Sequence, residues 1–164
     1  MPLSLLSARE QALAAHYRRV QHERMQGLPL LNPALAVETV GFAWTPPGEA
    51  AEPVGEGVLI TPWFMSLVRL PAEVQPAAGR VGRRCVHAFG CERFDFLGAW
   101  DAALGFHESC ALFSPMQGFD SQALARATAC EALALTRPVV PVSPALPAPQ
   151  QPGRRAFLAG RRAA

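Results

Sequence analysis

The sequence contains no lysine, and all 15 of its basic residues are arginine. This absence is typical of a compositional bias in the host genome and indicates no particular function. The sequence also lacks an apolar run of about 18 to 20 residues, the length that a membrane-spanning helix requires. No basic residue precedes the leucines of the first seven residues, so a secretory signal peptide is not expected. We therefore expect a soluble, cytoplasmic protein.

Motifs of the common hydrolases and nucleotide-binding enzymes are absent as well. The sequence has no GxSxG, no HExxH and no glycine-rich phosphate loop, and each of these motifs supplies the groups on which its chemistry depends. The four cysteines form no CxxC pair, and a cytoplasmic chain of this size does not need disulfides. The sequence therefore predicts a protein that is not an enzyme and has no cofactor.

Charge is distributed unevenly along the chain. Up to Thr136 there are 10 arginines and 13 acidic residues, a net charge of −3, whereas the remainder has five arginines and no acid. A net negative body argues against an extended nucleic-acid surface, because such a surface needs clustered basic residues. Half of the residues are hydrophobic, which is enough for one domain with a core.

Two amphipathic segments predict helices near the two ends of this body. In the first, Ser7 and Glu10 have the spacing of a capping box, so the helix is expected to begin at Ser7 and to end before Gly27. The second helix is expected over about 121–135, with Asp120 as its N-cap. Its helical spacing is traced by Leu124, Thr128, Glu131 or Ala132, and Leu135. Its many small alanines are expected to let it pack closely on a sheet.

Between these helices, β-branched and aromatic residues predict an antiparallel sheet. Residues 37–44 are expected to form a strand. Pro62 interrupts the most hydrophobic segment, and since proline cannot donate a ladder hydrogen bond, we expect two short strands joined at a bend, or an edge strand with a bulge. Residues 83–90 alternate as a strand does, with 92–100 as the antiparallel neighbour. The predicted fold is a single α+β domain, an antiparallel sheet covered by N- and C-terminal helices.

The predicted domain spans residues 1–136, and residues 137–164 differ in composition. Six prolines lie between residues 138 and 152, which favours an extended or disordered tail.

The stretch GRRAFLAGRR resembles the core of a twin-arginine export signal, but the residues after it are too few and too basic to enter a membrane, so we do not expect it to export the chain. It is either a solvated basic tail or a decoy that occupies a signal-peptide site. The residues of this likeness are Arg154, Arg155, Phe157 and Leu158.

Soft ligands in the middle of the chain suggest an alternative function, a metal-binding or redox accessory protein. The pattern C-x-H-x3-C followed by H-x2-C could bind zinc or iron, although it matches no zinc knuckle or ribbon. The competing interpretation is structural, a strand that buries a small thiol beside a hydrogen-bonded imidazole. The candidate ligands are Cys85, His87, Cys91 and Cys110, with His107 as a further candidate.

Two segments, TPWFMSLV and CALFSPM, combine large aromatic or sulfur-containing side chains with a proline. This composition favours an adaptable apolar groove that binds a partner. The alternative is that the same side chains are plain core. The predicted partner-binding residues are Trp63, Phe64, Met65, Phe113, Pro115 and Met116.

Longer segments around these residues carry a family resemblance. LPLLNPALAVETVGF, GVLITPWFMSLVRLP and LFSPMQGFDSQALARATA, in that order, resemble the HybE/HupJ (HoxT-like) family of [NiFe]-hydrogenase assembly chaperones, from about Arg24 to Leu135. The resemblance implies a cytoplasmic accessory protein that is not an enzyme. Its implied partner is the hydrogenase small-subunit precursor, whose twin-arginine signal peptide is held back until cofactors are in place, with the large subunit as a second candidate. It implies no catalytic residues.

A chaperone of this kind needs two features. An apolar groove would hold the hydrophobic region of the signal peptide, and carboxylates would bind its arginine pair, because a carboxylate matches the geometry of a guanidinium. The net negative body offers such carboxylates near the apolar segments. The candidates are Glu38, Glu49, Glu52, Glu56, Asp95, Asp101, Glu108 and Asp120.

Overall fold

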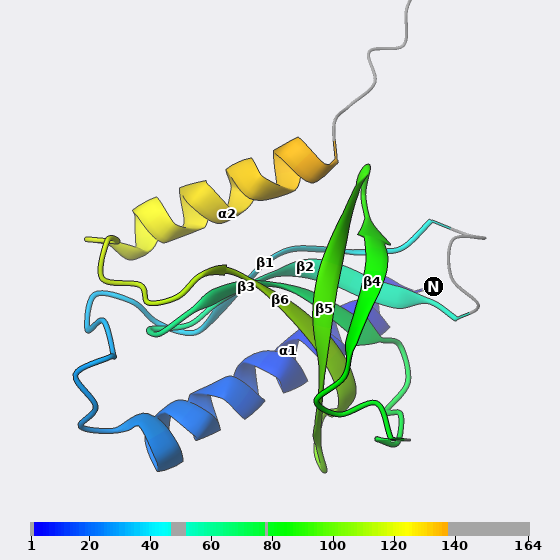
Figure 1. Cartoon of the computed structure of the whole chain (residues 1–164), viewed down its shortest axis with the longest axis horizontal. Coiled ribbons are helices and arrows are strands. Elements are labelled where there is room, and N and C mark those ends of the chain that lie inside the picture. The colour runs from blue at the N-terminus through cyan, green and yellow to red at the C-terminus, as the bar shows by residue number, and fades with distance from the viewer. Residues whose placement is uncertain (1, 47–51, 78, 138–164) are drawn as a thin grey trace, which may run out of the picture.

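A six-stranded antiparallel sheet with a helix on each face forms the centre of the molecule in the computed structural model of the chain (Figure 1). The structure describes residues 2–46, 52–77 and 79–137. The strand order is β1-β2-β3-β6-β5-β4, so β6 lies between β3 and β5. In chain order the elements are α1 (Leu3–Val20), the π-helical η1 (Gln21–Met25), β1 (Glu38–Trp44), β2 (Val54–Ile60), β3 (Met65–Pro71), β4 (Arg84–Phe89), β5 (Glu92–Asp101), β6 (Gly105–Phe113) and α2 (Gln122–Thr136). The predicted α+β architecture is confirmed.

Helix α1 begins at Leu3 rather than at Ser7, so the predicted capping box is wrong. Leu6 is buried together with Leu13, and the apolar stripe of the helix therefore starts before Ser7. Ser7 lies inside the helix, where its hydroxyl accepts a hydrogen bond from the side chain of Gln11 at 3.5 Å. The expected end is confirmed, because η1 ends before Gly27.

The sheet confirms the first of the two interpretations of Pro62. Strands β2 and β3 pair as an antiparallel hairpin on either side of it. Pro62 lies in the turn, where the hydroxyl oxygen of Thr61 accepts a hydrogen bond from the main-chain N–H of Phe64 at 2.9 Å. No ladder hydrogen bond is lost there. The predicted pairing of β4 with β5 is confirmed as well.

Strand β6 was not predicted from the sequence, although it lies in the middle of the sheet. Its polar residues interrupt the apolar pattern that is typical of a buried strand. The partners that satisfy them come from distant segments and cannot be recognised in the sequence. His107 contacts the hydroxyl of Tyr17 at 3.3 Å. On the opposite face, Glu108 accepts a hydrogen bond from Arg69 at 3.1 Å. Polar residues in a central strand are tolerated when such partners satisfy them.

Helix α2 has the predicted extent, but its cap is shifted by one residue, and its buried face lies one residue beyond the traced spacing. Ser121, not Asp120, is the N-cap, and its side chain accepts a hydrogen bond from the Leu124 N–H at 3.3 Å. Leu124 is 44% exposed and Leu135 is 75% exposed. The buried face consists of Ala125, Ala129, Leu133 and Thr136. Small alanines therefore form the contact with the sheet.

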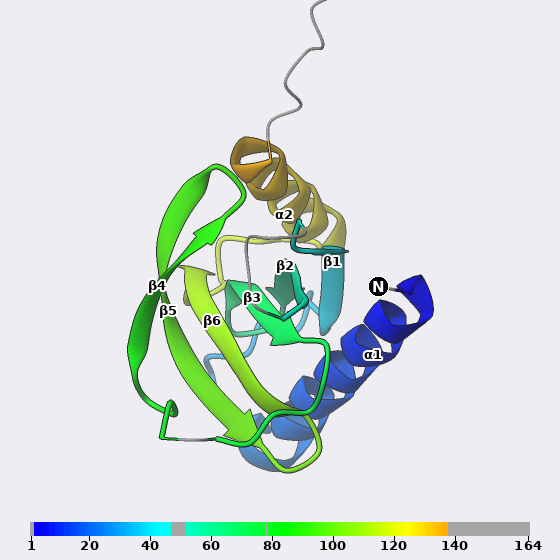
Figure 2. The ribbon, with the colours of Figure 1, turned by 90° about the vertical axis from the view of Figure 1, so that its right-hand side faces the viewer.

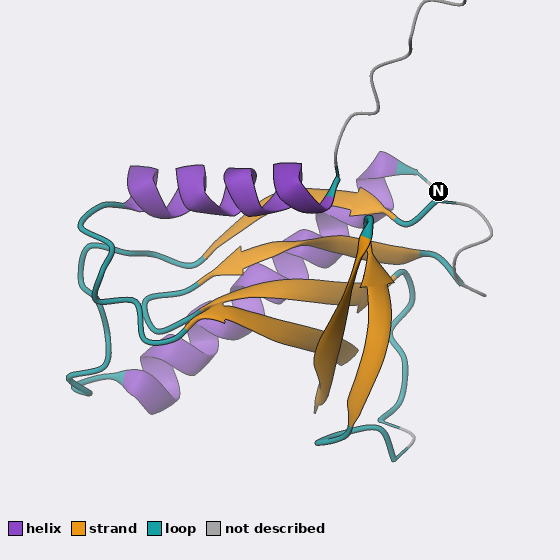
Figure 3. Cartoon of the chain, turned by 45° about the horizontal axis from the view of Figure 1, so that its top comes forward, coloured by secondary structure: helices purple, strands orange, loops and turns teal. Residues whose placement is uncertain are grey.

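Helices α1 and α2 lie on opposite faces of the sheet (Figure 2 and Figure 3). Side chains of the sheet alternate between the two cores on these faces. On β2, Val58 belongs to the α2-side core and Leu59 to the α1-side core. The β4–β5 hairpin contributes Phe89 and Phe96 to the α2-side core. Its turn is joined to the end of α2, because the Cys91 N–H donates to the carbonyl oxygen of Thr136 at 2.8 Å.

Polar groups also attach α1 to the sheet. The buried side chain of Arg9 donates to the carbonyl oxygens of Pro71 and Leu104, both at 3.0 Å. His107 is only 1% exposed, and this burial lowers its pKa. Burial likewise raises the pKa of Tyr17 to about 12. Both side chains are therefore uncharged at neutral pH.

The described part of the chain ends at Arg137, which was predicted to open the tail. Its guanidinium donates to the carbonyl oxygen of Gly41 at 2.8 Å and to that of Glu56 at 2.6 Å, so Arg137 is attached to the domain. The rest of the predicted tail, with its twin-arginine-like stretch, lies outside the described residues. None of the described helices is long and apolar enough to cross a membrane.

Candidate partner-binding site

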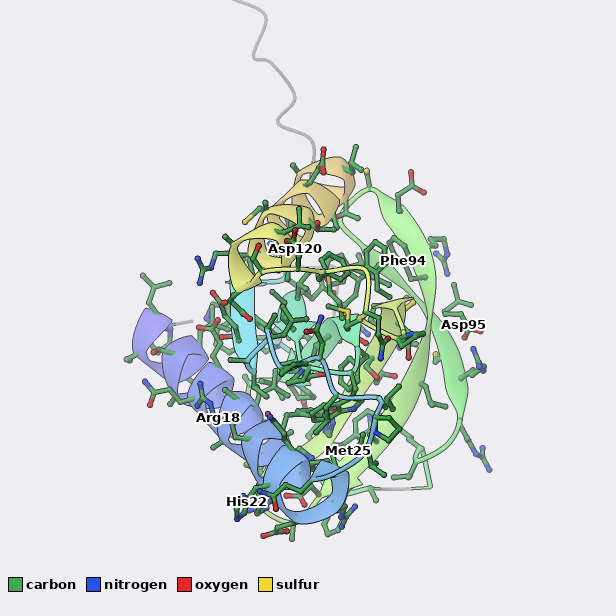
Figure 4. The ribbon with its side chains drawn as sticks, turned by 90° about the vertical axis from the view of Figure 1, so that its left-hand side faces the viewer. Arg18, His22, Met25, Phe94, Asp95 and Asp120 are labelled. Carbon is green, nitrogen blue, oxygen red and sulfur yellow. The ribbon has the colours of Figure 1, made fainter. Side chains whose placement is uncertain are left out.

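The three segments that carry the family resemblance meet at one end of the sheet. The first supplies the loop before β1, the second the turn between β2 and β3, and the third the connection from β6 to α2. Figure 4 looks onto this end, with Met25 at the end of η1 and Asp120 ahead of α2 at opposite borders. Segments that are far apart in the sequence therefore form one surface.

Asn32 joins these segments to one another. Its main-chain N–H donates to the carbonyl oxygen of Pro62 at 2.9 Å. Its side-chain amide donates to the carbonyl oxygens of Met116 at 2.9 Å and Phe119 at 2.7 Å. Asn32 is buried, and buried polar groups are stable only when they are paired. This role could not be predicted from the sequence, because the partners of the Asn32 side chain are 84 and 87 residues away.

Exposed apolar side chains gather around this junction. Phe113, at the end of β6, is 43% exposed, and Leu28 and Leu30 are 45% and 39% exposed. Trp63 is half-buried and Pro115 is exposed. These side chains come from the three segments that meet at this end, and exposed apolar side chains that lie together are typical of a binding site. We call it the apolar end, and it consists of Leu28, Leu30, Trp63, Phe113 and Pro115.

Of the six predicted partner-binding residues, three belong to the apolar end and three support it. Met65 and Met116 are completely buried in the α2-side core, so the alternative that they are plain core describes them correctly. Phe64 is half-buried. Its ring packs edge-on against Trp63 at a centroid distance of 5.6 Å and against Tyr17 at 5.5 Å. Phe64 thus packs between Tyr17 and the half-buried Trp63.

Most of the candidate carboxylates are already bound within the molecule. Glu38 pairs with Arg126, whose hydrogen bond lowers the pKa of Glu38. Asp101 accepts a hydrogen bond from the Ala103 N–H, and this bond lowers the pKa of Asp101. Intramolecular partners are also present for Glu52, Glu56, Asp95 and Glu108.

Asp120 differs from these carboxylates. It is exposed and forms no ion pair or side-chain hydrogen bond with any of the described residues. It lies directly before Ser121, the N-cap of α2, at the end of the sheet that Figure 4 shows. Glu49 lies outside the described residues. Asp120 is therefore the candidate carboxylate that is best placed to meet a cation on a partner.

The alternative metal constellation does not form. His107 faces α1, whereas His87 lies on the other side of the sheet and contacts Glu108 at 3.0 Å. The Cys91 thiol points to the carbonyl oxygen of Leu135 at 3.7 Å. Cys110 is partly buried, and this burial, with a contribution from Asp95, raises the pKa of its thiol. Across the described ranges, no group of three or more His, Cys, Asp or Glu side chains could hold a metal ion, so the structure does not bring the candidate ligands together.

Comparisons with known proteins agree with the resemblance. A family model described as "[NiFe]-hydrogenase assembly, chaperone, HybE" matches residues 8–160. Protein HoxT of Cupriavidus necator is 43% identical over 148 residues, which cover 85% of this chain and 81% of that protein. The hydrogenase expression/formation protein HoxT of Azotobacter vinelandii is also 43% identical, over 153 residues that cover 92% of this chain and 90% of that protein.

A solved structure has the same fold. The solution structure of HybE from Escherichia coli superposes with a TM-score of 0.55, and the match covers 95% of this chain and 91% of that one. The sequence identity of the pair is 23%. The arrangement of a sheet between two helices is therefore shared with that protein.

Proposed function

Because the chain belongs to the HybE family of [NiFe]-hydrogenase assembly chaperones, we propose that it binds the hydrogenase small-subunit precursor in the cytoplasm before export. The proposal extends to the twin-arginine signal peptide of that precursor. The protein acts by binding alone, without catalysis and without a cofactor. The large subunit is the second candidate partner.

The main support is the convergence of the three family segments on the apolar end. A twin-arginine signal peptide combines an arginine pair with an apolar stretch. The apolar stretch would pack on Trp63 and Phe113, where burial of aromatic surface provides most of the binding energy. An arginine would reach Asp120, whose carboxylate can accept two parallel hydrogen bonds from a guanidinium.

The basic stretch near the C-terminus could compete for the same surface. Its arginine pair, followed by Phe157 and Leu158, resembles the proposed cargo, and a tethered segment has a high effective concentration at its own domain. Truncation after Arg137 tests this idea and keeps the contacts of Arg137 with Gly41 and Glu56. Tighter precursor binding by the truncated chain would identify a decoy, and unchanged binding a solvated tail.

A pull-down from the native host during hydrogen-oxidising growth tests the proposed partner. The full chain, the Trp63→Ala variant and the Trp100→Ala variant serve as baits. Trp100 is 47% exposed and pairs with Phe106, at the opposite end of β6 from Phe113. We expect the small-subunit precursor with the full chain and Trp100→Ala, and much less with Trp63→Ala. Recovery of the large subunit alone, or no hydrogenase subunit at all, would contradict the proposal.

A further inference from the structure

A cavity lies at the other end of the sheet from the apolar end. It has a volume of about 750 Å³ and is lined by β2, β3, β4, β6 and the segment between β3 and β4. On β3, Leu67 belongs to the α2-side core, and Arg69, two residues further, lines the cavity on the same face. In Figure 2 the β4–β5 hairpin turns out of the plane of β1, β2 and β3. Arg84, Cys85 and His87 of β4 line the cavity. A volume in this range is typical of ligand pockets.

The carboxylates in the floor of this cavity have partners within the molecule. Arg69 donates to Glu56 at 2.9 Å and to Glu108 at 3.1 Å, and its side chain is only 10% exposed. Glu108 also contacts His87 at 3.0 Å. The guanidinium of Arg137 donates to the main-chain oxygen of Glu56 at 2.6 Å. Both carboxylates are therefore already paired within the molecule, which makes them poor sites for a cationic ligand.

At the rim of the cavity, positively charged side chains outnumber negatively charged ones. The guanidinium of Arg80 lies over the ring of Phe106 at 3.8 Å and donates to the side-chain oxygen of Gln75 at 2.9 Å. The side-chain amide of Gln75 in turn donates a hydrogen bond to the carboxylate of Glu52 at 2.5 Å. Arg83 lines the same rim, and its guanidinium forms no ion pair or hydrogen bond with the described residues. Two arginines thus face one carboxylate, which leaves the rim positively charged.

We infer that this cavity binds an acidic, extended peptide segment of a partner protein, with a carboxylate of the segment held by Arg80 and Arg83. A guanidinium presents a planar fork that matches a carboxylate, and stacking on Phe106 keeps the guanidinium of Arg80 in one orientation. Val54, which is partly buried, offers apolar surface to the rest of the segment. This site is separate from the apolar end, and the inference does not depend on which precursor occupies that end.

The protein's own C-terminal stretch is a poor occupant of this cavity. From Arg137 onward the sequence has five arginines and no acidic side chain, so its charge has the same sign as the rim. A segment of another protein that carries aspartate or glutamate fits the charge better. The two sites together would let one chaperone hold two chemically different segments.

Calorimetric titration of the full chain tests the inference. The probe is a blocked hexapeptide with two glutamates and two phenylalanines, and the control peptide has glutamines in place of the glutamates. We expect binding of the glutamate peptide, weakened about tenfold or more by the double substitution Arg80→Gln and Arg83→Gln, since charge-assisted bonds are the strong ones. The matched control is Arg93→Gln, because Arg93 is exposed on β5 and does not line the cavity. Equal affinity for both peptides would overturn the inference, and so would tighter binding of inorganic phosphate.

Cysteine labelling provides an independent test of location. Cys85 lines the cavity and is exposed, whereas Cys130 is exposed on α2. The glutamate peptide should slow iodoacetamide modification of Cys85 and leave that of Cys130 unchanged. Protection of both cysteines, or of neither, would overturn the inference. The Trp63→Ala variant should bind the peptide as the parent does, which separates a failure at this cavity from a failure at the apolar end.

Discussion

Asn32 donates a hydrogen bond of 2.9 Å from its side-chain amide to the carbonyl oxygen of Met116, across a separation of 84 residues. Met116 is completely buried, and its neighbour Pro115 is exposed in the apolar end. The bond therefore links the loop before β1 to the connection that presents Pro115. The shape of the proposed binding surface depends on a buried polar contact beneath it.

Replacement of Asn32 by alanine should destabilise the fold and weaken precursor binding. The substitution leaves the carbonyl oxygens of Met116 and Phe119 without their donor, at a cost of about 1–3 kcal/mol. Urea denaturation of the variant measures the loss. The matched control is Gln117→Ala, which removes an exposed hydrogen bond to the carbonyl oxygen of Leu30 and should cost less than about 1 kcal/mol. Equal losses for the two variants would show that Asn32 has no special role.

Replacement of Gly90 by alanine should separate the β4–β5 turn from α2. A Cβ atom at Gly90 would lie 1.9 Å from the carbonyl oxygen of Thr136, and the φ angle there is +62°. Gly82 has a similar φ of +72° with no described atom within 4 Å of an added Cβ, so Gly82→Ala introduces backbone strain alone, about 1–2 kcal/mol. The free energy of unfolding should fall by about 1–3 kcal/mol more in Gly90→Ala. Similar losses in both variants would contradict the tight contact between the turn and α2.

The stability of the protein should decrease as the pH falls below about 6.5, the ordinary pKa of histidine. Burial lowers the pKa of His107 and that of His16, so the unfolded chain binds protons before the folded one does. Stability from these groups is complete above pH 6.5 and is lost as the pH falls toward their folded pKa values.

Thermal denaturation between pH 7 and pH 5 checks this expectation. His107→Gln should show a flatter dependence of stability on pH than the parent, with the remaining slope due to His16. His22→Gln is the control, because His22 lies on η1, which has no buried residue, and its profile should follow that of the parent. A parent whose stability does not change over this range would contradict the buried, uncharged state of His107.

Arg69→Met should be much more destabilising than the loss of a surface ion pair. Arg69 is buried between the carboxylates of Glu56 and Glu108, and removal of one partner from such a buried group costs about 3–5 kcal/mol. Arg84→Met is the comparison, since Arg84 and Asp95 are 70% and 48% exposed and 3.3 Å apart. That exposed pair contributes about 0–1 kcal/mol. Chemical denaturation of both variants distinguishes the two environments. A loss of unfolding free energy in Arg69→Met as small as that in Arg84→Met would show that the charged groups in the floor of the cavity are not tightly coupled.

The parts of the fold that the sequence could predict depend on local rules. Proline in a hydrophobic segment forces a break, so β2 and β3 were separated correctly at Pro62. Helix α2 was located correctly, but its buried face could not be, because leucines and alanines occur on several sides and only contact with the sheet selects Ala125 and Ala129. Strand β6 was missed because Tyr17 and Arg69, the partners of its polar residues, are remote in the sequence.

In the candidate site, too, some features follow from local sequence and others depend on how the chain packs. Trp63 and Phe113 could be singled out by composition, since TPWFMSLV and CALFSPM each combine large aromatic or sulfur-containing side chains with a proline. Which side chains reach the surface is a property of the packing, so Met65 and Met116, which are fully buried, could not be told from Phe113. The availability of Asp120 became visible only when the partners of the other carboxylates were known.

Titration of the purified chain with the twin-arginine signal peptide of the hydrogenase small subunit tests the central claim most directly. The dissociation constant should rise about tenfold or more in Trp63→Ala and Phe113→Ala, as expected for aromatic residues at the centre of an interface, and it should rise in Asp120→Asn. It should be unchanged in Trp100→Ala. Binding that is equally strong in the parent, Trp63→Ala and Phe113→Ala, with all three folded, would contradict the account.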